Sequence, residues 1–103
     1  MTKEYDRILD FIKEDDFEII LCWIDKNTYG EIHYEPEQKI LINIYLLVFD
    51  TFIHEYMHEK YPELKGLKGE EKINDKTRKF VSRMKVSEIK KLAKYLMAEY
   101  HKS

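Results

Sequence analysis

The sequence predicts a small α+β domain in which a three-stranded sheet packs on a helix that carries the motif HExxH. Short runs of β-branched and aromatic residues before position 45 predict strands, and apolar residues spaced three and four apart after position 46 predict helices. The motif HEYMH, residues 54–58, falls within the first of these helical runs. A length of 103 residues with 44% apolar content suits one domain covering residues 1–103.

The N-terminal half contains one predicted helix and three predicted strands. Residues 3–13 have apolar side chains at helical spacing, and residues 17–24 are rich in β-branched and aromatic residues. The turn residues of DKNTYG, positions 25–30, separate this strand from the next one. GEIHYE (30–35) and KILINIY (39–45), joined by the turn PEQ, predict a hairpin.

The C-terminal half predicts three helices. The first runs from about Leu46, contains the HEYMH motif and ends near Pro62. A second helix is expected over residues 69–84, where it would carry the acidic sequence EEKIND. A third is expected over residues 87–100, with Ser87 as its N-cap and an apolar stripe that needs a partner.

Charge and hydropathy exclude several classes of function. The 20 acidic and 18 basic residues are interspersed and sum to a net charge of -2, so no nucleic-acid partner is expected. The longest apolar runs are too short to span a bilayer and no signal-peptide core is visible, which predicts a soluble, cytoplasmic protein without a membrane partner. The single cysteine, Cys22, lies in an apolar run and is expected to be a buried, unbridged thiol.

The spacing within HEYMH predicts a metal site. Residues four apart on a helix project from the same face, so His54 and His58 can hold one ion. Glu55 directly follows the first histidine and can deprotonate a metal-bound water, which is the chemistry of zinc-dependent amide hydrolysis. A catalytic zinc site needs a third protein ligand, and the sequence must supply it downstream.

The acidic segment EEKIND is expected to provide that ligand. We assign Glu71 as the third ligand because Asp75 lies one helical turn after it, where it can accept the free ring N–H of a ligand histidine. Adjacent Glu70 takes the ligand role if the helix begins in another register. The alternative for all three carboxylates is an ordinary charged face near a helix N-terminus.

Together, His54-Glu55-x-x-His58 and Glu71-x-x-x-Asp75 resemble the paired motifs of the gluzincin metallopeptidases. The small size and the order of elements look closest to the minigluzincins, over roughly residues 30–84. This resemblance implies a zincin-like fold and a zinc metalloendopeptidase acting on a peptide or an unfolded protein. It also implies latency imposed by the C-terminal segment, here residues 87–103.

The expected reaction is therefore peptide-bond hydrolysis with Zn²⁺ held by His54, His58 and Glu71, and with Glu55 as general base. The strand GEIHYE would bind an extended substrate by adding it to the sheet. The alternative is a metal-binding, self-associating protein with little or no catalytic activity, in which the C-terminal helix covers the cleft or is exchanged in a homodimer. A purely structural zinc module is disfavoured because Cys22 is alone.

Three further residues are given subsidiary roles. His33 is expected on the surface of the sheet, and His101 in a solvated tail from which it could approach the metal. Arg78 is expected to form a salt bridge to Asp75 or another carboxylate, with stabilisation of an oxyanion as the alternative.

Overall fold

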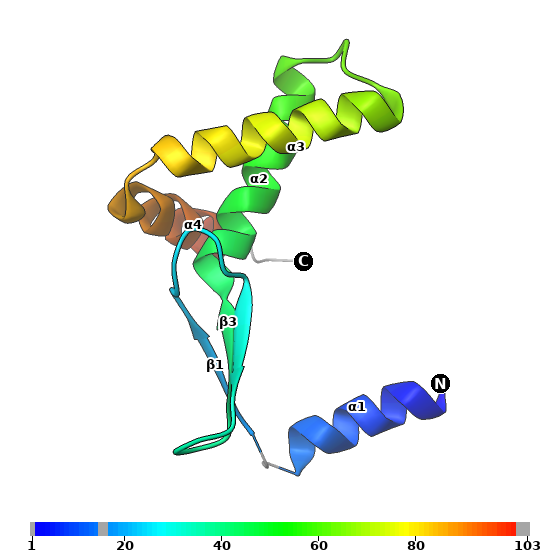
Figure 1. Cartoon of the computed structure of the whole chain (residues 1–103), viewed down its shortest axis with the longest axis vertical. Helices are drawn as coiled ribbons and strands as arrows, with labels where there is room; N and C mark the ends of the chain where they lie inside the picture. Colours follow the sequence, from blue (N-terminus) through cyan, green and yellow to red (C-terminus); the bar gives the residue numbers. More distant parts are fainter. Residues whose placement is uncertain (1, 15–16, 101–103) are drawn as a thin grey trace.

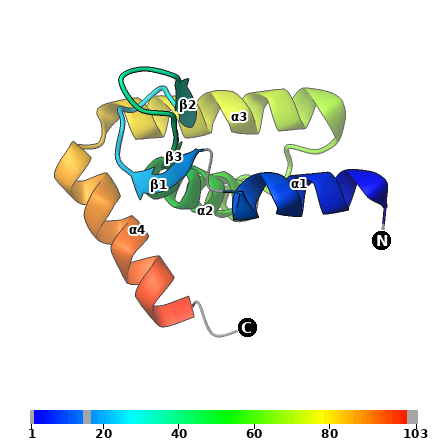
Figure 2. The ribbon, with the colours of Figure 1, turned by 90° about the horizontal axis from the view of Figure 1, so that it is seen from below.

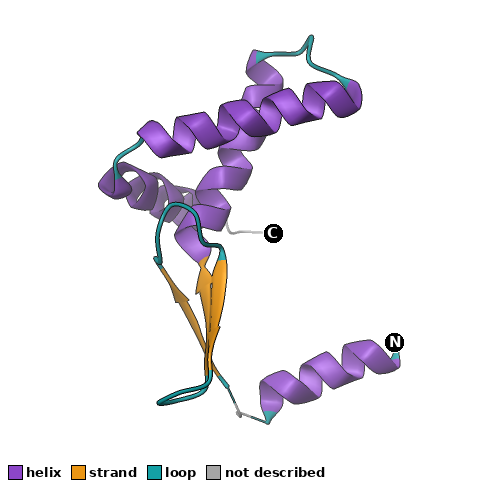
Figure 3. Cartoon of the chain, viewed as in Figure 1, coloured by secondary structure: helices purple, strands orange, loops and turns teal. Residues whose placement is uncertain are grey.

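A computed structural model describes residues 2–14 and 17–100 of the chain. Within these residues it contains four helices and a three-stranded mixed sheet, so the predicted α+β class is confirmed (Figure 3). The elements in chain order are α1 (Lys3–Lys13), β1 (Glu18–Cys22), β2 (Gly30–His33), β3 (Lys39–Asn43), α2 (Ile44–Lys60), α3 (Gly66–Arg83) and α4 (Val86–Tyr100).

The sheet has the strand order β1-β3-β2. Strands β2 and β3 pair antiparallel, with Ile32 opposite Ile40, which confirms the predicted hairpin. Strand β1 pairs parallel with β3, with Ile19 opposite Ile40. The third strand in sequence is therefore the central one, and β1 and β2 form the two edges of the sheet.

The expected packing of the sheet on the side of the HExxH helix is wrong. Strand β3 ends at Asn43 and α2 begins at the next residue, Ile44, without an intervening loop. The sheet therefore extends from the N-terminal end of α2 and does not lie along its flank (Figure 1). Because a helix needs an apolar partner along its side, α2 packs instead against α3 and α4.

The hydrophobic core lies among these three helices. Within the described residues every buried apolar side chain of this cluster comes from α2, α3 or α4, and none comes from a strand. Its members are Leu46, Phe49, Ile53, Met57, Ile73, Val81 and Ile89. The rings of Phe49 and Phe80 stack with their centroids 6.3 Å apart and join α2 to α3. Figure 2 shows α3 and α4 on different sides of α2.

A buried asparagine connects the sheet, the β1–β2 loop and α2. The side-chain oxygen of Asn43 accepts the backbone N–H of Leu46 at 3.2 Å and so caps α2. Its amide nitrogen donates to the backbone carbonyls of Asp25 and Thr28, both at 2.9 Å. The same loop reaches α3 through Lys26, whose ammonium group donates to the carbonyls of Ser82 and Met84 at the C-terminal end of that helix.

Two local expectations are corrected by the structure. Helix α4 begins at Val86, so Ser87 lies within its first turn and is not the N-cap. The N-terminal end of the helix is instead satisfied by Glu88, whose carboxylate accepts the backbone N–H of Lys85 at 3.0 Å. Cys22 is a free thiol, as expected, but it is only partly buried because the sheet contributes little to the core. No helix in residues 2–14 and 17–100 combines the length and the apolar character needed to cross a bilayer.

Candidate metal centre

The histidines of the HExxH motif lie on the face of α2 that is directed toward α3. Ile53 and Met57 immediately precede His54 and His58 and are buried in the core, which sets the rotation of the helix. As a result the two imidazoles emerge at the edge of the core, partly exposed, one turn apart. Their Nε2 atoms converge to 3.2 Å.

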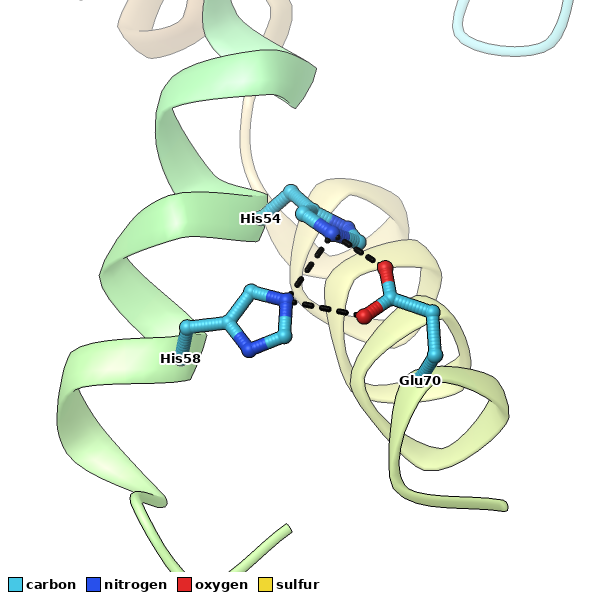
Figure 4. A group of neighbouring side chains, drawn as sticks. All are labelled: His54, His58 and Glu70. Atoms are coloured by element: carbon cyan, nitrogen blue, oxygen red, sulfur yellow. Dashed lines mark hydrogen bonds and ion pairs between the residues drawn. The ribbon is translucent and has the colours of Figure 1, made fainter. Parts of the chain in front are cut away.

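The third member of the group is Glu70, in the first turns of α3. Its Oε1 lies 2.6 Å from Nε2 of His54 and its Oε2 lies 3.0 Å from Nε2 of His58. Figure 4 shows the carboxylate of Glu70 facing both rings from the neighbouring helix. One ligand atom from each of these three residues can be chosen so that all lie within 4.8 Å of one another.

These side chains fit a divalent metal ion. Three ligand atoms of a tetrahedral zinc at the usual bond lengths are about 3.3 Å apart. Here the two histidine Nε2 atoms are 3.2 Å apart, and the two carboxylate oxygens of Glu70 lie 2.6 Å from His54 and 3.0 Å from His58, respectively. A small outward movement of Glu70 would therefore make room for an ion. Two imidazoles and one carboxylate form a donor set that catalytic zinc sites use, with a fourth position open to solvent.

The carboxylate that the structure brings to the two histidines is that of Glu70, the alternative to Glu71. Successive residues on a helix point about 100° apart, so only one of the two can face α2. Glu71 is exposed and lies outside the group of converging side chains. Asp75 is also directed away from the histidines and forms an ion pair with Lys79 at 3.1 Å. The expected contact of Asp75 with a ligand histidine is therefore wrong in this structure.

Two glycines at the start of α3 explain this register. Gly66 has a φ of +73°, a conformation that favours glycine and turns the chain from the end of α2 into α3. Gly69 is buried, and a Cβ at this position would lie 2.5 Å from the carbonyl carbon of Leu64. The connection can therefore cross close over the first turn of α3, and the residue after this crossing, Glu70, is directed toward the histidines.

Glu55, the expected general base, does not belong to the group of three converging side chains. It is exposed and lines a mostly apolar cleft of about 470 Å³ between α2 and α4, opposite Leu96. This position follows from its place one residue after His54, about 100° around the helix. Its carboxylate is thus on the side of α2 next to the face that carries the two histidines, and it is accessible to solvent.

A polar cavity of about 330 Å³ adjoins His54 on the N-terminal side. Asp50, one turn before His54, accepts a hydrogen bond from the hydroxyl of Tyr29 at 3.1 Å. Burial and the nearby Asp50 carboxylate raise the pKa of Tyr29. Asn74 and Arg78 line the same cavity from α3.

Sequence reasoning missed most of this cavity. The spacing of Asp50 to His54 could have indicated a shared helix face, whereas Tyr29 and Asn74 reach the cavity from separate elements. Asn74 lies one turn after Glu70, which is the place that Asp75 has relative to Glu71. Arg78 was expected to pair with Asp75 or another carboxylate. Asp75 pairs with Lys79, and Arg78 lines the cavity together with Asp50.

The remaining predicted residues lie away from the three ligand atoms. His33 contacts Glu31 at 2.8 Å on the sheet, which is consistent with the surface role given to it. His101 falls outside the described residues. The apolar stripe of α4 finds its partner in its own chain, since Ile89 and Ala93 are fully buried there. In this conformation α4 does not cover His54, His58 and Glu70, so the latency and helix exchange expected of residues 87–103 stay predictions.

Comparisons with protein families, with curated proteins and with solved structures found no match to this chain. The resemblance to the minigluzincins therefore stays a prediction based on the two motifs.

Proposed function

We propose that this chain is a zinc-dependent peptidase whose metal is held by His54, His58 and Glu70. One observation carries the proposal: the two histidines of an HExxH motif and one carboxylate from the following helix converge on a common point. The donor set favours zinc, and its partly exposed position leaves room for water and substrate. When bound, the ion would act as a Lewis acid that polarises a carbonyl and lowers the pKa of water.

Glu55 is the proposed proton carrier. Its carboxylate would accept a proton from the attacking water and return it to the leaving amine. For this, its side chain has to turn from the rim of the apolar cleft toward the open side of the histidines, which exposure to solvent permits. Leu96 and the other apolar residues of that cleft would lie next to the substrate.

The polar cavity beside His54 is the proposed site for the substrate backbone. Arg78 lines it with guanidinium N–H donors that can hold a peptide carbonyl oxygen as its negative charge grows. The edge strand β2 begins at Gly30, directly after Tyr29. An extended peptide that adds to this edge would therefore be led toward the cavity. Asn74 can accept the free ring N–H of His54 and take the role first given to Asp75.

The test combines metal analysis with hydrolysis of an unfolded protein. Purified wild type should contain about one zinc per chain and cleave unfolded casein in a chelator-sensitive reaction. Glu55→Gln should keep the zinc and lose hydrolysis by several orders of magnitude, because it removes the base and no ligand. Glu59→Gln, a matched change one turn later on α2, should keep both. Wild type that binds no zinc, or Glu55→Gln that retains full activity, would refute the proposal.

Metal binding without hydrolysis is a second candidate. It is favoured by the position of Glu55, which lines the α2–α4 cleft and stands apart from the three ligand atoms. The same experiment separates the two functions, since this second one predicts about one zinc per chain and no cleavage by wild type.

A further inference from the structure

Helix α1 presents an apolar stripe that no part of residues 2–14 and 17–100 covers. Tyr5, Ile8, Phe11 and Ile12 lie on one side of the helix with relative exposures between 41% and 56%, and Leu9 next to them is only partly buried. None of the eleven residues of α1 is buried. An isolated helix of this length is marginally stable in water, so the stripe needs a partner surface.

The sheet presents a second uncovered apolar surface. The strand pairing places Ile19, Leu21, Ile32, Ile40 and Ile42 on the same face, because paired residues in adjacent strands point to the same side. Three of them are strongly exposed, at 41% for Ile19, 60% for Leu21 and 50% for Ile32. We call this surface the aliphatic sheet face. The opposite face is mixed in character; it carries Glu18, Ile20, Cys22, Glu31, His33, Lys39, Leu41 and Asn43.

Aromatic contacts join the C-terminal end of α1 to one end of the sheet. The ring of Phe11 lies 5.5 Å from that of Phe17, and Phe17 lies 5.9 Å from Tyr34 in an edge-to-face arrangement. These contacts hold the C-terminal end of α1 at the far end of the sheet. The rest of the helix projects away from the strands, as Figures 1 and 2 both show.

We propose that α1 docks on the aliphatic sheet face of a second copy of this chain, and that the two copies exchange these helices reciprocally. Each copy holds one stripe and one face, so a twofold arrangement satisfies both surfaces and closes at two chains. The lengths match, since an eleven-residue helix is about 16 Å long and a five-residue strand about 17 Å. A helix covering one face of a sheet is also a common layer arrangement in small domains.

The charge of α1 argues for a protein partner and against a lipid surface. The helix KEYDRILDFIK carries three basic and three acidic residues and is therefore neutral overall. Helices that lie on membranes are usually rich in lysine and arginine on their polar side. The aliphatic sheet face can cover the apolar stripe of α1, and this contact requires no net charge on the helix.

The exchange would leave the candidate metal centre open. His58 lies near the C-terminal end of α2, whereas the sheet extends from the N-terminal end of that helix. The inference is therefore independent of the proposed peptidase activity, and it can be tested on protein with or without metal.

The first experiment measures the mass of the full chain by light scattering. Wild type should be a dimer at micromolar concentration, and Ile8→Asp should raise the dissociation constant at least about tenfold by placing a charge in the buried contact. The matched control Arg7→Asp introduces the same residue on the polar side of α1 and should leave the dimer intact. A monomeric wild type at millimolar concentration, or Ile8→Asp that dimerises as well as wild type, would overturn the proposal.

The second experiment identifies the surfaces by crosslinking in a Cys22→Ser background. A chain carrying Ile8→Cys and a chain carrying Ile32→Cys, mixed and mildly oxidised, should form a disulfide between the two chains, because each cysteine replaces a member of one of the facing surfaces. A chain carrying both substitutions should give a dimer linked by disulfides between its copies. A monomer closed by an internal disulfide would show that α1 folds onto its own sheet, and failure of the mixed chains to crosslink would exclude the contact.

Discussion

Replacing Glu70 tests the candidate metal centre most directly, because alanine at Glu70 should weaken zinc binding whereas alanine at the neighbouring Glu71 should not. The Glu70 carboxylate lies 2.6 and 3.0 Å from the two histidine Nε2 atoms, so Glu70→Ala removes one of three protein ligands. Zinc binding by four-ligand peptide sites provides about 10–16 kcal/mol, or roughly 3 kcal/mol per ligand. A loss of that size raises the dissociation constant for zinc at least about a hundredfold.

The assay is a chelator competition titration with a fluorescent zinc indicator, on protein whose fold is checked by circular dichroism. Glu71→Ala is the matched control, because Glu71 is the exposed neighbour on the same turn and should change the dissociation constant less than about twofold. If Glu71→Ala weakens zinc binding and Glu70→Ala does not, the register of α3 in this structure is wrong. Equal affinity in both variants and in wild type would show that no carboxylate from this segment holds the metal.

Three further predictions concern the structure around the site. In Gly69→Ala the added Cβ would lie 2.5 Å from the carbonyl carbon of Leu64, a strain that costs about 1–3 kcal/mol, and the better helix propensity of alanine offsets about 1 kcal/mol of it. The free energy of unfolding in urea titrations should therefore fall by up to about 2 kcal/mol, and a stabilised variant would contradict the close approach. Asn43→Ala should lower the free energy of unfolding by about 2–3 kcal/mol, because it removes the cap of α2 and two buried hydrogen bonds. An unchanged free energy of unfolding would show that water replaces the amide. Tyr29 should titrate above its ordinary pKa in an absorbance titration referenced to Tyr29→Phe, and Asp50→Asn should lower that pKa by removing the adjacent charge. Because the pKa of Tyr29 is raised on folding, the contribution of this tyrosine to stability is complete below pH 10 and is lost as the pH rises through the raised pKa. An unchanged pKa of Tyr29 in Asp50→Asn would refute the role assigned to the Asp50 charge.

Local sequence patterns determined the secondary structure well. The helical spacing around HEYMH, the alternation in residues 39–43 and the turn residues between the strands each depend on neighbours within a few positions. The hairpin of β2 and β3 followed from such local signals, and the convergence of His54 and His58 followed from the geometry of one helix turn. These features need no knowledge of the rest of the chain.

The choice between Glu70 and Glu71 was decided only in the tertiary structure. Both are acidic, both lie in the same helix, and each has a polar residue one turn later, so spacing alone could not separate them. The rotation of α3 depends on the turn at Gly66 and on the close passage of Leu64 over Gly69. Because a shift of one residue turns a helix by about 100°, this nonlocal contact selects the carboxylate that faces α2.

The packing partner of the sheet likewise could not be predicted from the sequence. Alternating apolar residues predict a strand with one apolar face, but they do not say which surface will cover it. Strand β3 passes directly into α2, so α2, α3 and α4 form the core among themselves and the aliphatic sheet face is left exposed. The periodicity of the sequence determined which faces of the helices and strands are apolar. Contacts between distant segments decided which of those faces are buried, because burial depends on the relative positions of whole helices and strands.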